Sequence, residues 1–502
     1  MDVRYERIVV LGGGTAGWMA ALAFATGLSR SSVTLVESEE VGIVGVGEAT
    51  FPSIRAFHDI VKVDEADFLR ATNGTYKLGI RFCDWRERGT DYFHTFGSFG
   101  PVDGPNTLWG QYRRLRRNPL PGGQDAPGVL GEQCLPTVMA MHGRFCMPAP
   151  KQGAHFNYAY HFDATLYSAY LRELAVKRGV QRVEGKVVDV ARRPDGAVAS
   201  LRLADGREIA GDLFIDCSGF VSLLLGRTLE EPFVDFSHWL PVDRAWACPA
   251  EPKDENPTPY TRATALEAGW SWRIPLRNRT GFGHVFSSRY IDENRAREQL
   301  LAQMDGTPLA EPRLLRFTTG HRQRFWVNNV VALGLSSGFL EPLESTSIYL
   351  VQSGLGRLMG LLQEGKPVGA DAVRSYNTGL VRQFERIRDF IILHYCLTQR
   401  RDSAFWRDMG SMALPETLAF KLHAWRQAGV LHQYDEEGFD ESSWLAIHAG
   451  MDDWPERCDP RHAEMPPDEA GRWLEGRRRQ LVQVAESLPT HQEFLAHVLG
   501  KA

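Results

Sequence analysis

The first forty residues alternate short apolar runs with turn and helix signals. Ile8 to Leu11 is an uninterrupted apolar run, which is typical of a buried parallel strand. Glycines fill the next positions, Trp18 to Thr26 has the composition of a helix, and Val33 to Val36 is a second apolar run. This order of strand, turn, helix and strand predicts a βαβ unit at the start of the chain.

The segment from Val180 to Cys217 has a different pattern, with scattered valines and two Asp-Gly pairs. The pairs at 195–196 and 205–206 predict tight turns between hairpin strands. Leu213 to Asp216 is expected to be a further buried strand, and Val330 to Leu333 a later one. The middle of the chain is therefore expected to add strands to the opening βαβ unit.

The C-terminal third is predominantly helical in pattern. A helix is expected to begin near Ser347, with one apolar stripe formed by Ile348, Leu350, Val351 and Leu355. Segments 371–397 and 468–499 are also expected to be helical. By contrast, residues 97–153 are rich in glycine and proline, which predicts a long loop that covers a site.

Composition narrows the class of protein. The chain has 502 residues, enough for more than one structural lobe, and its net charge of -5 gives no basic surface for nucleic acid. Seven cysteines without Cys-x-x-Cys spacing argue against a metal site and against a disulfide framework, so a cytoplasmic protein is expected. No apolar run approaches the roughly 20 residues that span a bilayer, so no membrane segment is expected.

A dinucleotide signature lies in the first βαβ unit. The string Gly12-x-Gly14-x-x-Gly17 follows a strand and opens a helix, whose N-terminus can bind a pyrophosphate. Glu37 ends the second strand, where a carboxylate can bind ribose hydroxyls. The alternative is a glycine-rich turn of an unrelated α/β protein. The residues expected to contact the nucleotide here are Gly12, Gly14, Thr15, Ala16, Gly17 and Glu37.

Three further glycine-containing segments favour FAD over NAD. They are Gly45 to Pro52, Asp216 to Phe220, and the late strand that ends at Gly334. Glycines after a middle strand and after a late strand are typical of the additional flavin contacts in two-domain flavoproteins. An NAD-dependent dehydrogenase does not need these segments.

Motifs along most of the chain resemble the flavin-dependent tryptophan halogenases. In order, they are Gly47-Glu48-Ala49-Thr50-x-Pro52, Tyr76-Lys77-Leu78-Gly79, Tyr92 to Gly97, Trp270-Ser271-Trp272-Arg273-Ile274-Pro275, and Gly338 to Thr346. The resemblance implies an α/β fold with a Rossmann-like, glutathione-reductase-like FAD module in residues 1–350. It also implies a mainly helical C-terminal subdomain, residues 351–502, that completes the substrate site.

The same resemblance implies an oxidoreductase that uses FADH2, O2 and bromide or chloride to form hypohalous acid. This acid halogenates an electron-rich aromatic compound, expected to be an indole. A separate flavin reductase supplies FADH2, and a homodimer is possible. The further cofactor contacts that the resemblance implies are Ala49, Val187, Gly334, Leu335 and Ile348.

Two residues in distant motifs are the candidate catalytic groups. The resemblance implies that Lys77 holds hypohalous acid or forms a haloamine with it, whereas an isolated lysine is more often a solvated surface charge. It implies that Glu344 stabilises the cationic ring intermediate and takes its proton. The alternative for Glu344 is an acidic residue that interacts with a helix N-terminus. Thr346 and Ser347 are the expected halide site, and Ser347 stands where the family commonly has glycine.

The candidate substrate contacts are aromatic. They are His94, Phe96, Trp270 and Trp272, of which the two tryptophans are implied to line a tunnel. The alternatives are core packing for Phe96 and one buried face of an edge strand for the Trp270 to Pro275 string.

Family members that accept free tryptophan hold its polar groups with adjacent tyrosines and a glutamate. This chain has no Tyr-Tyr pair, and the matching stretch offers His432, Tyr434, Glu437 and Phe439. Free tryptophan is therefore expected to be a poor substrate. The acidic run Asp435 to Glu437 and the remaining histidines have no other expected role and are expected at the surface.

Two other functions fit the same cofactor motifs. One is an FAD-dependent aromatic monooxygenase of related fold, and the other is a flavin-binding protein that has lost catalysis. The presence of both Lys77 and Glu344 argues against an inactive protein. The sequence does not identify the natural substrate or the ring position that is halogenated.

Overall fold

The computed structural model describes residues 5–41, 47–101, 107–117, 129–149, 155–362, 368–457 and 459–500. Residues 45 and 46 of the flavin-type string and parts of segment 97–153 lie outside these ranges. The chain forms two compact units that interleave along the sequence. Unit 1 comprises Met1–Gly74, Phe162–Asp243 and Arg316–Glu385, and unit 2 comprises Thr75–His161, Arg244–Leu315 and Arg386–Ala502. The expected functional division near residue 350 stays a prediction.

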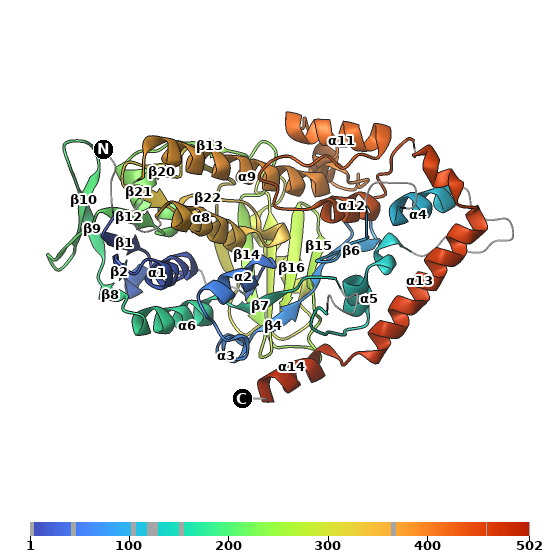
Figure 1. Ribbon diagram of the computed structural model, residues 1–502, viewed down its shortest axis with the longest axis horizontal. Helices are drawn as coiled ribbons and strands as arrows, with labels where there is room; N and C mark the ends of the chain where they lie inside the picture. The colour runs from blue at the N-terminus through green and yellow to red at the C-terminus, as the bar shows by residue number, and fades with distance from the viewer. Residues whose placement is uncertain are drawn as a thin grey trace. The chain divides into compact units, whose positions relative to one another are not determined.

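A mainly parallel six-stranded sheet forms the centre of unit 1. Its strands, in spatial order, are β20 (Trp326–Val327), β21 (Val330–Ala332), β12 (Leu213–Asp216), β1 (Arg7–Leu11), β2 (Ser32–Glu37) and β8 (Gln181–Glu184). All neighbouring strands pair in parallel except the antiparallel edge pair β20–β21. Helix α1 (Thr15–Gly27) connects β1 to β2, and α6 (Ala164–Lys177) lies beside α1 (Figure 1). The βαβ prediction is confirmed.

The predicted hairpins form a second, three-stranded sheet in unit 1. Strands β9 (Val187–Arg192), β10 (Val198–Leu203) and β11 (Glu208–Ala210) pair antiparallel. Gly196 and Gly206 have φ angles of +86° and +88°, as the turns between these strands require. The prediction was wrong for the first strand, because β8 joins the parallel sheet beside β2. Strand β8 lies at the edge of its sheet, and its one valine, Val183, is only partly buried. Its sequence pattern therefore cannot be distinguished from that of a hairpin strand.

Short elements complete unit 1. They are the 3-10 turns η6 (Gly334–Ser336) and η7 (Pro342–Glu344), the small sheet of β13 (Phe233–Asp235), β19 (Gly320–Arg322) and β22 (Gly338–Phe339), and helices α2 (Ser53–Ile60), α3 (Glu65–Ala71) and α8 (Ser347–Leu361). The predicted stripe on α8 is buried at all four positions. Burial of this stripe confirms the helix expected near Ser347.

A seven-stranded sheet forms the centre of unit 2. Its order is β18 (Arg313–Arg316), β14 (Arg244–Ala250), β17 (Thr280–Phe286), β16 (Gly269–Pro275), β15 (Thr261–Ala265), β5 (Gly79–Cys83) and β6 (Asp91–Thr95). Strand β16 carries the Trp270 to Pro275 string between two antiparallel neighbours, and all its residues are buried. The edge-strand alternative for this string was therefore wrong. A separate short strand, β4 (Thr75–Lys77), pairs with β7 (Ala159–Asp163).

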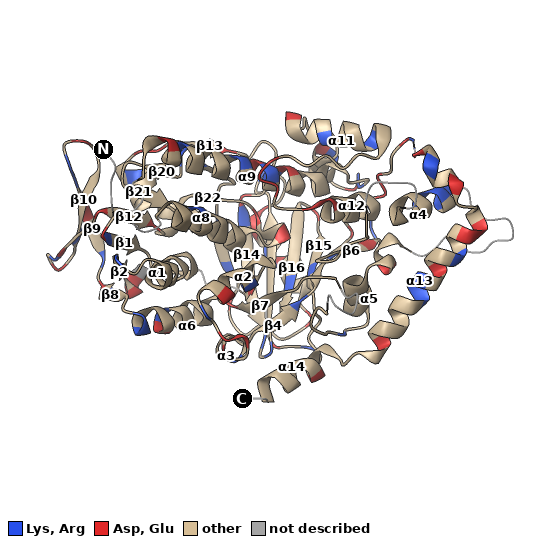
Figure 2. Ribbon diagram, in the orientation of Figure 1, with Lys and Arg blue, Asp and Glu red and all other residues tan. Residues whose placement is uncertain are grey.

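Helices make up the rest of unit 2. Helix α9 (Ala370–Cys396) begins in unit 1 and ends in unit 2, and the later helices are α10 (Ala404–Met409), α11 (Glu416–Ala428), α12 (Glu441–Gly450), α13 (Pro467–Ser487) and α14 (His491–Gly500). The single helical segment expected at 468–499 is thus two helices, separated at Pro489, which lacks a backbone donor. Acidic and basic residues alternate along α13 (Figure 2). Among the described helices, none has the length and apolar composition needed to cross a membrane.

The segment expected to be one long loop contains helices α4 (Leu108–Arg117) and α5 (Leu135–Met141). The loop prediction was wrong for these parts because helical spacing places Leu108, Trp109, Tyr112 and Leu115 in one apolar cluster. Trp425 of α11 and Leu474 of α13 belong to the same cluster. Packing in unit 2 therefore stabilises helices in a segment whose glycine and proline content suggested a loop.

Candidate active site

The glycine turn between β1 and α1 is shaped by close backbone contacts. The Gly12 amide donates to the Val36 carbonyl at 2.8 Å. Gly12 has a φ of +115°, and a Cβ atom at this position would lie 2.2 Å from the carbonyl oxygen of Cys217. A Cβ atom at Gly14, by contrast, would meet nothing within 4 Å. The turn therefore packs tightly against the Cys217 backbone at Gly12, whereas the space next to Gly14 is open.

That open space lies at the N-terminus of α1. Gly14 caps the helix without a side-chain hydrogen bond, and α1 carries no charged residue (Figure 2). The amide groups of the first turn have no partner within the helix, which makes this end suitable for an anionic phosphate. Glu37 ends β2, and its Oε1 accepts from Arg182 Nε at 2.5 Å. Together these residues fit the pyrophosphate and ribose of a dinucleotide.

The other expected cofactor residues occupy several elements of unit 1. Gly334 has a φ of +70°, and a Cβ atom there would lie 2.8 Å from the Cβ of Ala16, so η6 lies against the start of α1. Leu335 follows in η6, and Ile348 is buried in α8. Ala49 ends β3 (Gly47–Ala49). Val187 packs against the apolar cluster that includes Val9 and Val36 of the parallel sheet. The structure thus brings Gly334 to the glycine turn.

Lys77 is a buried lysine of β4. It is fully buried, and its Nζ lies 5.2 Å from the centroid of the Phe96 ring. Alternation along the strand places Tyr76 on the opposite face, where its ring stacks on Phe145 at 4.3 Å. The surface alternative for Lys77 is therefore wrong.

A chain of buried polar groups connects β4 to the end of the tryptophan string. The Thr75 hydroxyl donates to the carbonyl of Pro275 at 2.8 Å. The same oxygen lies 3.1 Å from Nδ1 of His161, whose Nε2 lies 2.9 Å from the hydroxyl of Thr261. Burial, and next the nearby Lys77 charge, lower the pKa of His161 well below its ordinary value. Neutral His161 thus helps hold the strand of Lys77 to β15, and Thr75 holds the same strand to β16.

Glu344 and the expected halide residues occupy consecutive positions in unit 1. Glu344 ends the turn η7 and is buried, and Ser345 follows with a φ of +60°. Thr346 caps α8 without a side-chain hydrogen bond to the helix, and its buried Oγ1 has no partner within the described residues. Ser347 is the first residue of α8. A buried hydroxyl beside a helix N-terminus fits a small anion such as a halide.

Trp270 and Trp272 lie in a wall of aromatic rings in unit 2. Their centroids are 6.1 Å apart, and Trp270 lies 6.5 Å from Trp85. Trp85 is held from both sides, since its Nε1 donates to Ala263 and its carbonyl accepts from the Thr398 hydroxyl. This arrangement fixes the ring that supports Trp270.

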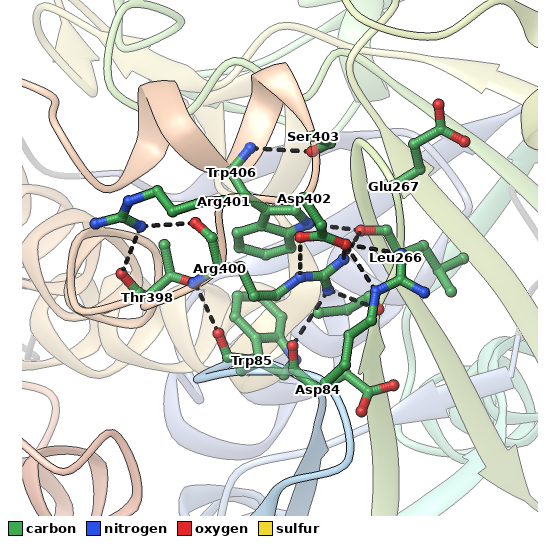
Figure 3. Close-up of polar contacts among 12 residues, drawn as sticks. Asp84, Trp85, Leu266, Glu267, Thr398, Arg400, Arg401, Asp402, Ser403 and Trp406 are labelled. Carbon is green, nitrogen blue, oxygen red and sulfur yellow. Dashed lines mark hydrogen bonds and ion pairs between the residues drawn. The ribbon is translucent and has the colours of Figure 1, made fainter.

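The loop that carries Trp85 is anchored by Arg400 (Figure 3). Its guanidinium donates to the carbonyls of Asp84, Ala265 and Leu266. It also forms two hydrogen bonds to Asp402, at 3.0 and 2.9 Å. Arg400 therefore joins two turns of the sheet to the segment that follows α9, and it holds the Trp85 turn in place.

His94 lies at the edge of a second aromatic group. Its ring centroid is 5.6 Å from that of Phe390 and 6.0 Å from that of Phe439. Phe390 and Phe439 stack with centroids 3.9 Å apart, and Trp444 packs edge-on against Phe390 at 5.1 Å. The structure thus brings His94 together with Phe439, which the sequence placed in the matching stretch of the substrate site. Stacked aromatic rings can bind an aromatic substrate.

Sequence reasoning missed two cations beside this aromatic group. Lys421 is buried, pairs with Glu437, and lies 3.7 Å from the centroid of the Trp444 ring. Arg386 is also buried, 4.4 Å from the centroid of the Tyr434 ring. The burial of Lys421 could have been predicted from the sequence, because Lys421 lies on the apolar stripe of α11 between Leu418 and Trp425.

Two expectations about surface residues were wrong in part, although Asp435, His142 and His423 are exposed as expected. The Glu437 side chain is only 8% exposed, because Lys421 pairs with it inside the protein. Many of the remaining histidines are also buried, where hydrogen bonds hold the rings. These buried histidines are His58, His161, His284, His321, His394, His448, His462 and His491.

Comparison with known proteins places these motifs in one family. Residues 7–467 match the family model described as tryptophan halogenase. The chain is 34% identical to the 7-chloro-L-tryptophan 6-halogenase KtzR of Kutzneria sp., with 98% of this chain and 99% of the relative covered. Among solved structures, it is similar to the flavin-dependent halogenases Xcc4156 of Xanthomonas campestris and BrvH of Brevundimonas sp. BAL3. The identities are 42% and 41% and the TM-scores 0.93 and 0.92, with 99% of each chain covered in both comparisons. The chain therefore belongs to the tryptophan halogenase family of flavin-dependent halogenases, enzymes that use FADH2 and halide.

Proposed function

We propose that this halogenase transfers bromine or chlorine to an indole ring, with Lys77 and Glu344 as its catalytic residues. The observation that carries the proposal is the complete burial of Lys77 beside Phe96, in a unit that also contains the aromatic group around His94. A lysine without a functional role is rarely buried among aromatic rings, because burial disfavours its charge.

When bound, FADH2 would supply the two electrons that reduce O2, and the reduced oxygen would oxidise halide to hypohalous acid. Flavin-dependent halogenases receive FADH2 from a separate reductase. The ammonium of Lys77 then holds the oxygen of hypohalous acid by a hydrogen bond. The ring's electron pair forms the carbon–halogen bond as the oxygen–halogen bond breaks. The proton from Lys77 converts the departing hydroxide to water, and the carboxylate of Glu344 takes the ring proton. Once solvent has carried a proton from Glu344 back to Lys77, the sum is one aromatic C–H and one hypohalous acid converted to one aryl halide and one water.

The halide is proposed to bind at the start of α8. The backbone amides of Thr346 and Ser347 and the buried Thr346 hydroxyl support this assignment. Ser347 keeps the backbone donor but adds a side chain where the family commonly has glycine. This substitution changes the shape of the halide site without removing a donor.

Free tryptophan is proposed to be a poor substrate. Its ammonium group needs a carboxylate, and the Glu437 carboxylate is already paired with Lys421. An ammonium placed there would compete with Lys421 and approach a second cation, Arg386. The substrate is therefore proposed to be indole, a substituted indole, or an indole within a larger molecule.

The test is a reaction of the protein with FAD, a flavin reductase, NADH, O2 and bromide, with indole as substrate. A brominated indole supports the proposal. An indole hydroxylated regardless of bromide would indicate an aromatic monooxygenase, and flavin turnover without any aromatic product would indicate a protein that has lost the transfer step.

A cytoplasmic homodimer is also proposed. The six cysteines in the described ranges are free, which supports a reducing compartment. Light scattering of the purified protein measures the number of subunits, and fractionation of the producing cells measures the location.

A further inference from the structure

Arg386 is a buried cation with unused hydrogen-bond donors. Its side chain lies on α9 in a residue that is 9% exposed, and its guanidinium carbon lies 4.4 Å from the Tyr434 ring centroid. Within the described part of the chain, its buried Nε and Nη1 atoms have no hydrogen-bond partner. A ring face attracts the charge but leaves N–H donors unsatisfied, and unsatisfied buried donors are costly.

The neighbouring charged groups already form two pairs. Arg388 donates to Oδ1 of Asp389 from Nε at 3.0 Å and from Nη2 at 2.8 Å. The second oxygen of Asp389 accepts from the hydroxyl of Thr417, which is partly buried. Lys421 pairs with Oε1 of Glu437. Arg386 is thus a third cation beside two carboxylates that other cations already hold.

Glu437 does not remove this imbalance. Its Oε2 is buried and has no partner among the described residues. If Arg386 turned toward this oxygen, Arg386 and Lys421 would share a single carboxylate. Burial also raises the pKa of Glu437 and lowers the pKa of Lys421, the directions expected where solvent cannot stabilise the charges. In either arrangement the group of five side chains carries one excess positive charge.

The excess charge lies close to the aromatic group of the proposed substrate site. Phe390 follows Arg386 by one turn of α9, so the two side chains share a face of that helix. Phe390 stacks on Phe439 and lies 5.6 Å from His94. Lys421 lies against Trp444, whose ring packs on Phe390. Arg386 thus lies one helical turn from a ring that contacts His94, which makes it the candidate partner for a polar group on a substrate whose ring binds at His94.

We propose that Arg386 binds a carboxylate of the aromatic substrate and so selects indoles that carry a negative charge without a positive one. This inference rests on the proposed function and names the substrate class for the same site. A carboxylate neutralises the excess charge and accepts hydrogen bonds from the unused guanidinium donors. A neutral indole leaves Arg386 unpaired, and an ammonium group is repelled by Arg386 and Lys421.

The experiment compares four compounds in the bromination assay: indole, indole-3-propionate, tryptamine and L-tryptophan. Their net charges are zero, negative, positive and zero, the last as a zwitterion. The expected kcat/KM for indole-3-propionate is at least about tenfold that for indole, mainly through a lower KM, because the carboxylate forms charge-assisted hydrogen bonds with the guanidinium. Tryptamine is expected to be the poorest of the four.

Variants of Arg386 test which residue causes this preference. Arg386→Met is expected to reduce the ratio of kcat/KM between indole-3-propionate and indole to about one, and Arg386→Lys to retain part of it. The matched control is Arg382→Met, which removes an exposed arginine one turn earlier on α9 and is expected to leave the ratio unchanged. Calorimetric titration of each variant with indole-3-propionate measures binding without turnover.

The outcomes separate the inference from the proposed function. If indole is brominated but indole-3-propionate has no advantage, or if Arg386→Met keeps the advantage, the assignment of Arg386 is wrong and the halogenase proposal stands. If Arg386→Met weakens both substrates equally, Arg386 is structural and the inference is also wrong. If none of the four compounds is brominated, the proposed indole substrate fails, and calorimetry alone then decides whether Arg386 binds the carboxylate.

Discussion

The Nζ atom of Lys77 lies 5.2 Å from the centroid of the Phe96 ring, inside unit 2 and away from solvent. The sequence motifs assigned different roles to these two residues, one to halogen transfer and the other to substrate contact. Their proximity means that a reagent held by Lys77 would lie close to a ring that contacts Phe96.

Replacing Lys77 with alanine is expected to abolish halogenation, because the hydrogen bond that holds hypohalous acid is lost. FAD binding and the rate of flavin reoxidation should remain near those of the unchanged protein, since Lys77 is not among the proposed cofactor contacts. Product analysis and stopped-flow absorbance measure the two properties. Full halogenation by Lys77→Ala would refute the assigned role.

Replacing Glu344 with glutamine is expected to slow halogenation by about two orders of magnitude or more, the usual effect of losing a positioned base. The amide keeps the shape of the buried side chain, so thermal stability should change little. Single-turnover rates with preformed FADH2 measure the effect. A rate within a factor of about two of the unchanged protein would exclude Glu344 as the base.

The two glycines of the turn give a matched pair of variants. Gly12→Ala is expected to unfold at lower temperature and to lose FAD, because its Cβ would lie 2.2 Å from the Cys217 carbonyl oxygen. Gly14→Ala should fold normally, because its Cβ would meet nothing within 4 Å. Its methyl group would instead enter the space proposed for the pyrophosphate and lower FAD affinity. Thermal unfolding and FAD titration measure both effects, and Gly14→Ala with unchanged FAD affinity would place the cofactor elsewhere.

Free tryptophan is expected to react more slowly than indole at equal concentration. The carboxylate available for its ammonium group is held by Lys421, and forming a new ammonium contact requires breaking that buried pair. Rates with the two substrates, measured separately under identical halide and FADH2 supply, make the comparison. Faster turnover of tryptophan would show that the pair opens for a zwitterion.

Stability should fall as the pH drops from about 6.5 toward about 4. Burial lowers the pKa of His491 to about 4, although its hydrogen bond to Pro257 acts in the opposite direction. Its Nδ1 lies 2.7 Å from the Pro257 carbonyl, and its Nε2 accepts from the Tyr76 amide at 3.1 Å. Protonation of Nε2 would place a donor against a donor. Because the folded state binds fewer protons than the unfolded state between these pH values, stability decreases as the pH is lowered.

The variant His491→Gln measures this contribution. Its free energy of unfolding should depend less on pH in that window, by up to about 1.4 kcal/mol per pH unit. Above pH 7 the two proteins should have the same pH dependence. An equal slope for both proteins between pH 6.5 and 4 would show that His491 is not held neutral.

The parallel strands could be predicted because buried strands of such a sheet are continuous apolar runs, as in Ile8 to Leu11. The start of α1 was placed too late, at Trp18, because Thr15 and Ala16 carry no apolar periodicity and lie inside the glycine string. Edge strand β8 was assigned to a hairpin for a similar reason, since its pairing with β2 depends on the tertiary fold. The local hydrophobic pattern thus located buried strands and helices more accurately than it located helix ends and edge strands.

The candidate site shows the same difference between residues in local motifs and residues brought together by folding. Lys77 and Glu344 could be named as candidates because their motifs are local in sequence. The cluster of Arg386, Lys421 and Glu437 could not, because α9, α11 and the segment before α12 are brought together only by folding. A charged residue in an apolar stripe indicates that a partner exists but does not identify it.

The most direct test of the account is mass spectrometry of the product formed from indole in the presence of the protein, FAD, flavin reductase, NADH, O2 and bromide. The account predicts a monobrominated indole with the bromine isotope doublet, absent without bromide and absent with Lys77→Ala. Brominated product that persists with Lys77→Ala, or an oxygenated indole formed equally without bromide, would contradict it.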